Sequence, residues 1–69
     1  MMKFLETITA LENDVLIPIN RIKFVHKKYT DRGSWCIRIV SDDGDWEEYF
    51  GNDQEKCDKR YEMIKNSLL

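Results

Sequence analysis

The stretch from Trp35 to Phe50, WCIRIVSDDGDWEEYF, predicts two antiparallel strands joined by a tight turn. Asp43-Gly44 stands between two runs of apolar, β-branched and aromatic residues. This dipeptide is the strongest short-range signal of a hairpin, because both central residues of a type I′ turn need positive φ. We therefore expect the hairpin to be the centre of the fold.

The register of this hairpin assigns its side chains to two faces. With a two-residue loop at Asp43-Gly44, Ile39 is expected to lie opposite Glu48, and Ile37 opposite Phe50. One face then collects the apolar side chains of Trp35, Ile37, Ile39, Trp46 and Phe50. The other face is mixed and suits water or a partner, with Cys36, Arg38, Val40, Glu47 and Tyr49. A three-residue loop would move both aromatic side chains of the second strand to the mixed face, so the two-residue loop is preferred.

The residues before this hairpin predict three further strands. Phe4 to Leu11 alternates apolar and polar side chains, and Glu12 to Asp14 has turn chemistry. A second strand starts at Val15 and ends in a kink at Pro18 to Asn20, because proline lacks an amide donor. A third strand covers Arg21 to Tyr29, with Ile22, Phe24, His26 and Lys28 on one side, and Thr30 to Gly33 closes the next hairpin.

The residues after the hairpin predict one helix. Asn52 has the form of an N-cap, with Glu55 three residues later to complete a capping box. Within Asp53 to Leu68 a single apolar stripe is formed by Cys57, Tyr61, Ile64 and Leu68. We expect this stripe to cover the sheet.

Together these elements predict a single α+β domain over residues 1–69. Connections of two to four residues cannot make parallel crossovers, so the strands are expected to form an antiparallel meander of four to five short strands. The C-terminal helix is expected to pack across one face of this meander.

The order of elements carries a resemblance. Ile19-Asn20, Ile22 and Asp43-Gly44 follow the pattern strand, turn, I-N-x-x-I, strand, D-G turn, strand, helix. In this pattern the chain resembles small bacterial and phage proteins and is distantly similar to the FlbD-like flagellar family. The resemblance implies the fold, and it assigns no functional role to any residue of this chain.

Length and composition bound the class of protein. A chain of 69 residues buries only about 60% of its unfolded surface, so the core is expected to be small. With 42% hydrophobic and 35% charged residues the chain is expected to fold without a partner. No apolar run approaches the roughly 20 residues that cross a bilayer, and Glu6 and Glu12 interrupt any signal-peptide core. These features predict a cytoplasmic protein that does not bind membranes.

The chemistry-bearing residues predict no catalytic site, no metal site and no cofactor. The acids around Asp43 lack the spacing of a calcium loop. His26 is expected to be a partly buried structural residue. Cys36 and Cys57 lack C-x-x-C spacing and are expected to stay unbridged on opposite sides of the sheet. No glycine-rich loop is placed to form an oxyanion site, so we do not expect an enzyme.

Charge is segregated along the sequence and suggests two classes of partner. From Arg21 to Arg38 there are six basic residues and one acid, with aromatic residues between them. Cations meet phosphates and aromatic rings stack on bases, so this run is a possible nucleic-acid surface with Arg21, Lys23, Lys27, Lys28, Tyr29 and Arg32. Basic and acidic strands that are neighbours in a meander also neutralise each other, as Arg38 is able to do with Glu47 or Glu48.

From Asp42 to Asp58 there are eight acids and one base, and this acidic part favours a protein partner. Our leading hypothesis is a small protein-interaction module, adaptor-like or inhibitor-like, that binds a protein or a second copy of the chain. The contact residues would be Asp45, Trp46, Glu47 and Tyr49, with Tyr49 as anchor on an edge strand. The plainer alternative is that Tyr49 only covers Arg38 across the strand pair.

Overall fold

Within the residues that the structure describes, five antiparallel strands and one C-terminal helix make up the fold, which confirms the α+β class. The computed structural model describes residues 3–8 and 14–68. In chain order the elements are β1 (Phe4–Ile8), β2 (Asp14–Pro18), a 3-10 turn η1 (Ile19–Arg21), β3 (Ile22–Tyr29), β4 (Trp35–Ser41), β5 (Gly44–Gly51) and α1 (Gln54–Ser67). The predicted continuation of the first strand to Leu11, and most of the turn after it, lie outside the described residues.

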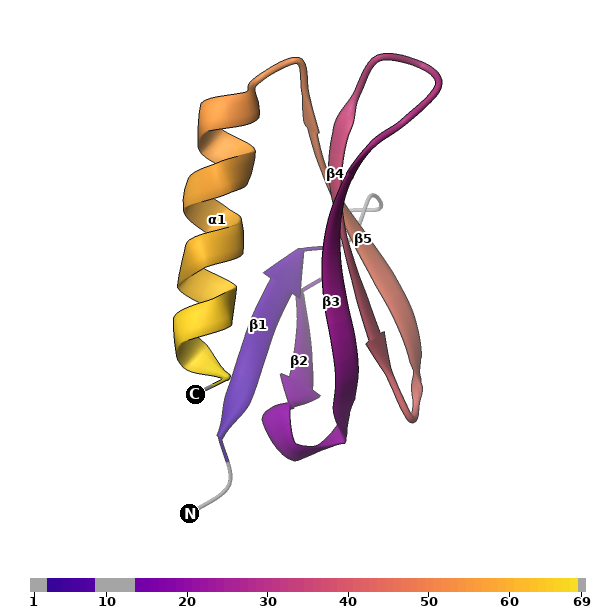
Figure 1. Ribbon diagram of the computed structural model, residues 1–69. Coiled ribbons are helices and arrows are strands. Elements are labelled where there is room, and N and C mark those ends of the chain that lie inside the picture. The colour runs from indigo at the N-terminus through magenta and orange to yellow at the C-terminus, as the bar shows by residue number, and fades with distance from the viewer. Residues whose placement is uncertain (1–2, 9–13, 69) are drawn as a thin grey trace.

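The strands are divided between two sheets rather than joined in one continuous meander. β1 pairs with β2, and the second sheet has the order β3-β4-β5. The break falls at Pro18, where the predicted kink takes the form of η1, because proline cannot donate to a ladder. Figure 1 shows α1 and the β1–β2 hairpin on the same side of the three-stranded sheet.

The β4–β5 hairpin forms, but its predicted register is wrong. Ser41 lies opposite Gly44, so the two loop residues are Asp42 and Asp43. The Ser41 hydroxyl explains the choice, because it donates to the Gly44 carbonyl at 3.1 Å and accepts from the Asp43 amide at 3.2 Å. The side-chain hydrogen bonds favour this earlier turn over one centred on Asp43-Gly44.

The two faces of the hairpin are nevertheless those predicted. Ile39 lies opposite Trp46 instead of Glu48, a slip of two residues along β5. Because side chains alternate with a period of two, a slip of two residues leaves each side chain on its expected face. A bulge at Trp35 and Cys36 then accommodates the end of the ladder.

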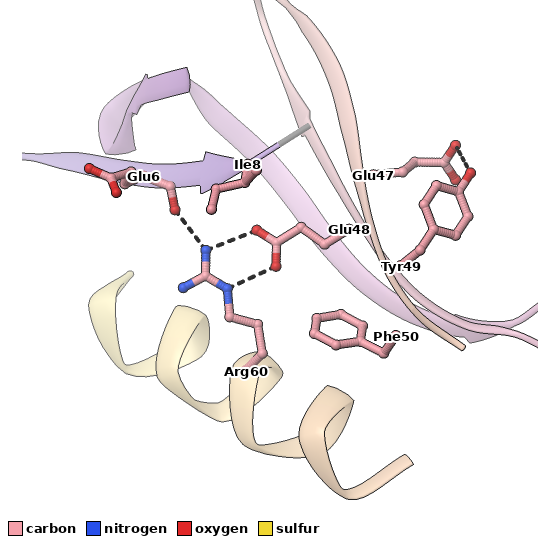
Figure 2. A pocket seen from close by; sticks show the side chains of 7 residues that line it. All are labelled: Glu6, Ile8, Glu47, Glu48, Tyr49, Phe50 and Arg60. Atoms are coloured by element: carbon pink, nitrogen blue, oxygen red, sulfur yellow. Dashed lines mark hydrogen bonds and ion pairs between the residues drawn. The ribbon is translucent and has the colours of Figure 1, made fainter. Parts of the chain in front are cut away.

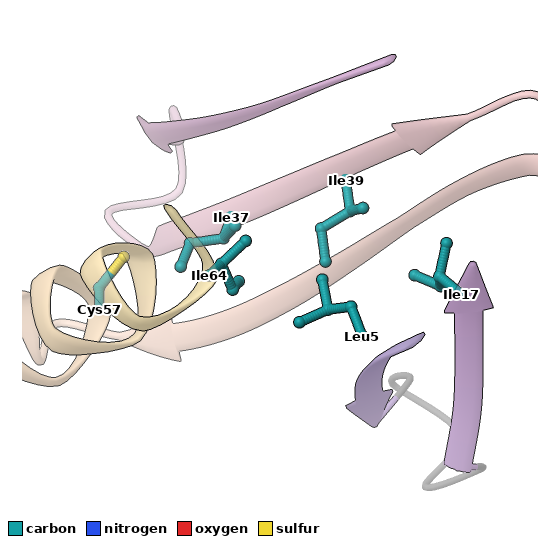
Figure 3. Packing of buried hydrophobic residues seen from close by; sticks show 6 residues of the cluster. All are labelled: Leu5, Ile17, Ile37, Ile39, Cys57 and Ile64. Carbon is teal, nitrogen blue, oxygen red and sulfur yellow. The ribbon is translucent and has the colours of Figure 1, made fainter. Parts of the chain in front are cut away.

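The core lies between the three-stranded sheet and the layer formed by α1 and the β1–β2 hairpin (Figure 3). Its buried members are Leu5, Ile17, Ile37, Ile39, Cys57 and Ile64. Ile64 of α1 lies beside Ile37, whereas Leu5 and Ile17 lie towards the Ile39 end. The predicted helix stripe is confirmed, since Cys57 and Ile64 are buried and Tyr61 and Leu68 are packed against the cluster.

The helix begins one residue later than predicted. Asp53, not Asn52, is the N-cap, and its Oδ1 accepts from the Lys56 amide at 3.0 Å. The Asp53 amide donates to the Phe50 carbonyl, and Gly51 has a φ of 61°. This turn uses Asn52 to reverse the chain, so the first residue free to cap the helix is Asp53.

The inner and outer faces of β3 also differ from the prediction. A register shift between Ile22 and Phe24 interrupts the alternation, so that Ile22 and Val25 pack on the core while Phe24 is 52% exposed. His26 is exposed as well, where we expected a partly buried residue. The cause is the bulge, because one extra residue moves every later side chain to the other face.

Candidate functional site

β5 is an edge strand. Of the strands that the structure describes, only β4 pairs with it, so alternate backbone amides and carbonyls along its other side have no strand partner. β3 is the edge on the opposite side of the same sheet. A groove lies beside the β5 edge.

The groove has a volume of about 660 Å³ and runs along β5 (Figure 2). It is lined by Glu6, Ile8, Glu47, Glu48, Tyr49, Phe50 and Arg60. Four consecutive residues of β5 take part, although successive side chains of a strand point to opposite faces. The groove therefore extends over the free edge of β5 and not only over one face of the sheet.

An ion pair between Arg60 and Glu48 forms the inner wall of the groove. Arg60 donates from Nε to Glu48 Oε1 at 2.8 Å and from Nη2 to Oε2 at 2.9 Å. The Arg60 and Glu48 side chains are only 20% and 9% exposed, respectively. The hydrogen bond to Glu48 is the main cause that raises the pKa of Arg60 above its ordinary value. A bidentate pair of this kind also fixes orientation.

Two further hydrogen bonds attach β1 to this pair. Thr7 Oγ1 donates to Glu48 Oε2 at 2.5 Å, and Arg60 Nη2 donates to the Glu6 carbonyl at 2.7 Å. The group Thr7, Glu48 and Arg60, which we call the clamp, thus joins β1, β5 and α1. It holds one end of the groove in a defined shape.

The sequence contains a pattern that points to the clamp: two charged residues stand at positions that are expected to face the core. Arg60 lies three residues after Cys57 and four before Ile64, which places it beside the buried stripe of the helix. Glu48 alternates with Trp46 and Phe50 on the apolar face of β5. A charged residue at each of these inward positions predicts a buried ion pair. The residues next to each of them in the sequence do not show that the two pair with each other.

The predicted contact residues on β5 have different environments. Trp46 is half-buried and packs against the core, so it is not free to act as an anchor. Asp45 forms an ion pair with Arg38. The predicted pairing of Arg38 with Glu47 or Glu48 is therefore wrong: Glu47 lies directly opposite Arg38, but the ion pair runs diagonally to the next carboxylate on that face.

At the groove, Tyr49 is exposed and Glu47 is half-buried. Tyr49 is 55% exposed and lies opposite Cys36, so it does not simply cover Arg38. Its hydroxyl donates to Glu47 Oε1 at 3.0 Å, and Lys28 Nζ lies 3.2 Å from Glu47 Oε2. The hydrogen bonds from Lys28 and then Tyr49 lower the pKa of Glu47. Glu47 is consequently a carboxylate at neutral pH.

The alternative basic surface is largely neutralised within the molecule. Four ion pairs join it to acids: Arg21 with Asp43 at 3.2 Å, Lys23 with Asp42 at 3.6 Å, Lys27 with Asp58 at 2.6 Å and Lys28 with Glu47 at 3.2 Å. Tyr29 packs edge-on against Trp35, and Arg32 is exposed in the turn after β3. Cations already paired with carboxylates attract phosphates less strongly, so this arrangement disfavours a nucleic-acid surface.

Other kinds of site find little support in the described residues. Within 3–8 and 14–68 no three His, Cys, Asp or Glu side chains are grouped to hold a metal ion. In the same part of the chain no helix has the length and apolar character needed to cross a membrane. Comparisons with protein-family models, curated proteins and solved structures return no match. The likeness to the FlbD-like family accordingly stays a prediction.

Both cysteines are free and buried. Their burial allows a prediction of how fast they react with thiol reagents. Burial, followed by the neighbouring Glu47 carboxylate, raises the pKa of Cys36 to about 11. Burial also raises the pKa of Cys57. Because the thiolate is the nucleophile, we expect native Cys36 at pH 8 to react with thiol reagents roughly two orders of magnitude more slowly than an exposed cysteine.

Labelling followed by mass measurement checks this expectation. In denaturant without reductant, two thiols should react at once. In the native protein, labelling of Cys36 should accelerate as the pH rises towards 11, since the thiolate then becomes populated. Finding fewer than two thiols in denaturant would reveal a disulfide, and rapid native labelling at pH 8 would show that the thiols are accessible.

Proposed function

We propose that the protein is a small interaction module that binds an extended segment of a protein partner along the free edge of β5. The observation that carries the proposal is the groove of about 660 Å³ beside that edge. Strand addition uses the main-chain groups of an edge for affinity and pockets for alternate side chains for specificity. β5 offers both features, and an adaptor or an inhibitor is the kind of protein that uses them.

The outer part of the groove supplies the anchor. Tyr49 presents an exposed aromatic ring whose orientation is held by its hydrogen bond to Glu47. Tyrosine is among the residues most often found at the centre of protein interfaces, because it buries a large area and loses few rotamers. We assign Tyr49 as the anchor and Glu47 as the polar contact of the bound segment.

The proposal includes no catalytic step and places the protein in the cytoplasm. His26 is exposed on β3, and the Cys36 thiol is protonated at neutral pH, so neither is poised as a base or nucleophile. Two unbridged cysteines suit a reducing compartment.

Binding measurements on three variants test the proposal. A partner is first captured from the native host and purified, and its affinity is then measured by calorimetry. Tyr49→Ala and Glu47→Lys should each weaken binding by about tenfold or more, the loss typical of truncating or reversing an interface anchor. Phe24→Ala is the matched control, because Phe24 is also a half-exposed aromatic residue on the outer face but belongs to β3. Its affinity should equal that of the parent.

Circular dichroism must first show that each variant is folded. If Tyr49→Ala and Glu47→Lys are folded and bind as tightly as the parent, the interface lies elsewhere, and the β3 edge from Ile22 to Tyr29 becomes the better candidate. The nucleic-acid alternative is examined with the same protein by a titration of non-specific DNA at low salt. Binding that falls steeply with added salt would favour the basic surface.

A further inference from the structure

The backbone of β5 presents its free hydrogen-bonding groups at alternate residues. Ser41 and Gly44 are paired across a loop of two residues, and a pair this close to the turn must exchange both of its main-chain hydrogen bonds. Hydrogen-bonded pairs alternate with non-hydrogen-bonded pairs along an antiparallel ladder. The N–H and C=O groups of Asp45, Glu47 and Tyr49 therefore point away from β4 and form the free edge.

The side chains of a strand that pairs with this edge would lie in two rows, because successive side chains alternate between the faces of a sheet. The outer row would lie beside Glu47 and Tyr49. The inner row would lie beside Ile8 and Phe50, which Figure 2 shows on opposite sides of the clamp. Ile8 is 58% exposed, so its apolar surface is open to a ligand.

The carboxylate at the outer row is already satisfied within the molecule. Glu47 accepts hydrogen bonds from the Tyr49 hydroxyl at 3.0 Å and from the Cys36 thiol at 3.5 Å, and it lies 3.2 Å from Lys28 Nζ. Asp45 does not line the groove. A cation on a ligand would have to displace Lys28, and an exposed ion pair adds little affinity in any case. The outer row therefore has no strong preference for either sign of charge.

The charged groups at the inner row are satisfied as well. Both carboxylate oxygens of Glu48 accept from Arg60, and one of them also accepts from Thr7. Figure 2 shows the Glu6 carboxylate turned away from β5, whereas the Glu6 carbonyl accepts from Arg60. A charged side chain in this row would lose water without gaining a free opposite charge, which is costly. Charge complementarity therefore favours an apolar side chain here.

We infer that the β5 edge binds an extended segment with an apolar side chain at every second residue, and that it selects this segment through Ile8 and Phe50 and not through the charge of the other side chains. This inference rests on the proposed function and names the chemistry of its ligand. Glu47 then contributes its main-chain groups and orients Tyr49. The four β5 residues that line the groove span about 13 Å at 3.3 Å per residue, so a segment of roughly four to six residues fills it.

Neither β2 nor β3 of a second copy supplies such a segment. The alternate apolar residues of β2, Val15 and Ile17, pack on the core of their own molecule, and Pro18 has no amide hydrogen to donate. In β3, Lys27 belongs to one alternating set of side chains and Lys28 to the other, so neither set is apolar throughout. The occupant is therefore a segment of a different protein.

Synthetic peptides test the inference without the natural partner. The probe is a capped heptapeptide in which serine alternates with valine, titrated into ¹⁵N-labelled protein while the amide resonances are followed by NMR. It should shift the amide signals of residues 45–50. At saturation it should also slow hydrogen exchange at residues 45, 47 and 49, because their amides gain partners. The amides of residues 46 and 48 already bond to β4, so their exchange should change little.

Peptides of matched length change one row at a time. Replacing the valines by serine or by lysine should weaken binding by about tenfold or more, because the apolar contact is lost. Two further peptides keep the valines and replace the serines by lysine or by glutamate. At about 0.15 M salt these two should bind within about fivefold of each other, since exposed charges are then largely screened and their pairs are weak.

Two variants of the protein examine the apolar wall. Ile8→Ser should weaken binding of the serine–valine peptide by about tenfold. Leu16→Ser is the matched control, because Leu16 is 59% exposed on the same face of the β1–β2 hairpin but does not line the groove. Its affinity should stay within about twofold of the parent, as expected for a surface substitution outside the interface. Circular dichroism confirms that both variants are folded before the titrations.

Several outcomes would overturn the inference, and they differ from failure of the proposed function. Equal binding of the all-serine or the lysine–serine peptide would show that the inner row does not select apolar side chains. A difference of more than about fivefold between the lysine–valine and glutamate–valine peptides would show that charge selects the ligand. If no peptide shifts the β5 signals, or if sedimentation shows that a second copy occupies β5, the inference is also wrong. The proposed function fails separately, when the purified natural partner is insensitive to Tyr49→Ala and Glu47→Lys.

Discussion

Replacing Ile64 with alanine is expected to lower the free energy of unfolding by about 2 to 4 kcal/mol. Ile64 is fully buried at the centre of the helix stripe, where Figure 3 shows it beside Ile37 of β4. The substitution removes packed methyl and methylene groups and leaves a cavity that the sheet cannot close. For a domain of this size, such a loss is a large share of the total stability.

Chemical denaturation measures the effect, and Met63 supplies the control. Met63 is the preceding residue of the same helix and is 55% exposed. Met63→Ala should therefore change the free energy of unfolding by no more than about 0.5 kcal/mol. If Ile64→Ala costs as little as Met63→Ala, the helix does not pack on the sheet in the way described.

Replacing Glu48 with alanine is the second large effect, and we expect a loss of about 2 to 4 kcal/mol. The variant leaves the Arg60 guanidinium without its carboxylate in a site where its side chain is only 20% exposed, and it removes the acceptor of the Thr7 hydroxyl. Removing one partner of a buried pair is costly because the other charge stays desolvated. Glu55→Ala provides the contrast: the Glu55–Lys59 pair has side chains 80% and 76% exposed, and its loss should have a much smaller effect.

A double variant separates two contributions to the free energy of unfolding: that of the Glu48–Arg60 ion pair itself, and the cost of leaving Arg60 buried without a partner. Glu48→Leu combined with Arg60→Met replaces the pair by apolar side chains and should recover most of the stability that Glu48→Ala loses. Unfolding curves in urea are sufficient for the comparison. A Glu48→Ala protein that unfolds at the same urea concentration as the parent would show that the clamp contributes nothing to holding β1 against β5.

The clamp links stability to the proposed binding site. Glu48 and Arg60 line the groove with their side chains, and Figure 2 shows Arg60 of α1 reaching both Glu48 and the Glu6 carbonyl. A groove of fixed shape loses less entropy when a ligand binds than a groove that must first be ordered. Under the proposed function, the buried pair would preorganise the groove for its ligand, whether or not it adds net stability over an apolar pair.

Local features were readable from the sequence because their causes are local. The alternation of Leu5 and Thr7, the break at Pro18 and the stripe that includes Cys57 and Ile64 follow from side-chain periodicity and backbone chemistry within a few residues. For the same reason, the α+β class and the inward face of the hairpin were predicted correctly. The exposed position of Tyr49 also followed from this alternation.

The sequence did not decide between alternative turns or helix caps that lie one residue apart. The turn at Asp42 and Asp43 competed with one at Asp43-Gly44, and Asp53 competed with Asn52 as the helix cap. Each pair of alternatives is a residue apart and close in local energy, so hydrogen bonds from Ser41 and from the Asp53 amide decided between them. The bulge in β3 that exposes Phe24 and His26 belongs to the same class.

By itself, the sequence determined the strands, the helix and, outside β3, the faces that they bury, because these depend on residues close together in the chain. Only the tertiary structure decided the division into two sheets, the clamp and the groove at the β5 edge. The Thr7 hydroxyl bonds to a carboxylate 41 residues away, and Arg60 lies 12 residues from the same group. Groups so far apart in the sequence are brought together by the packing of whole elements. This packing buries inward-facing polar side chains at positions where they can form hydrogen bonds only with one another.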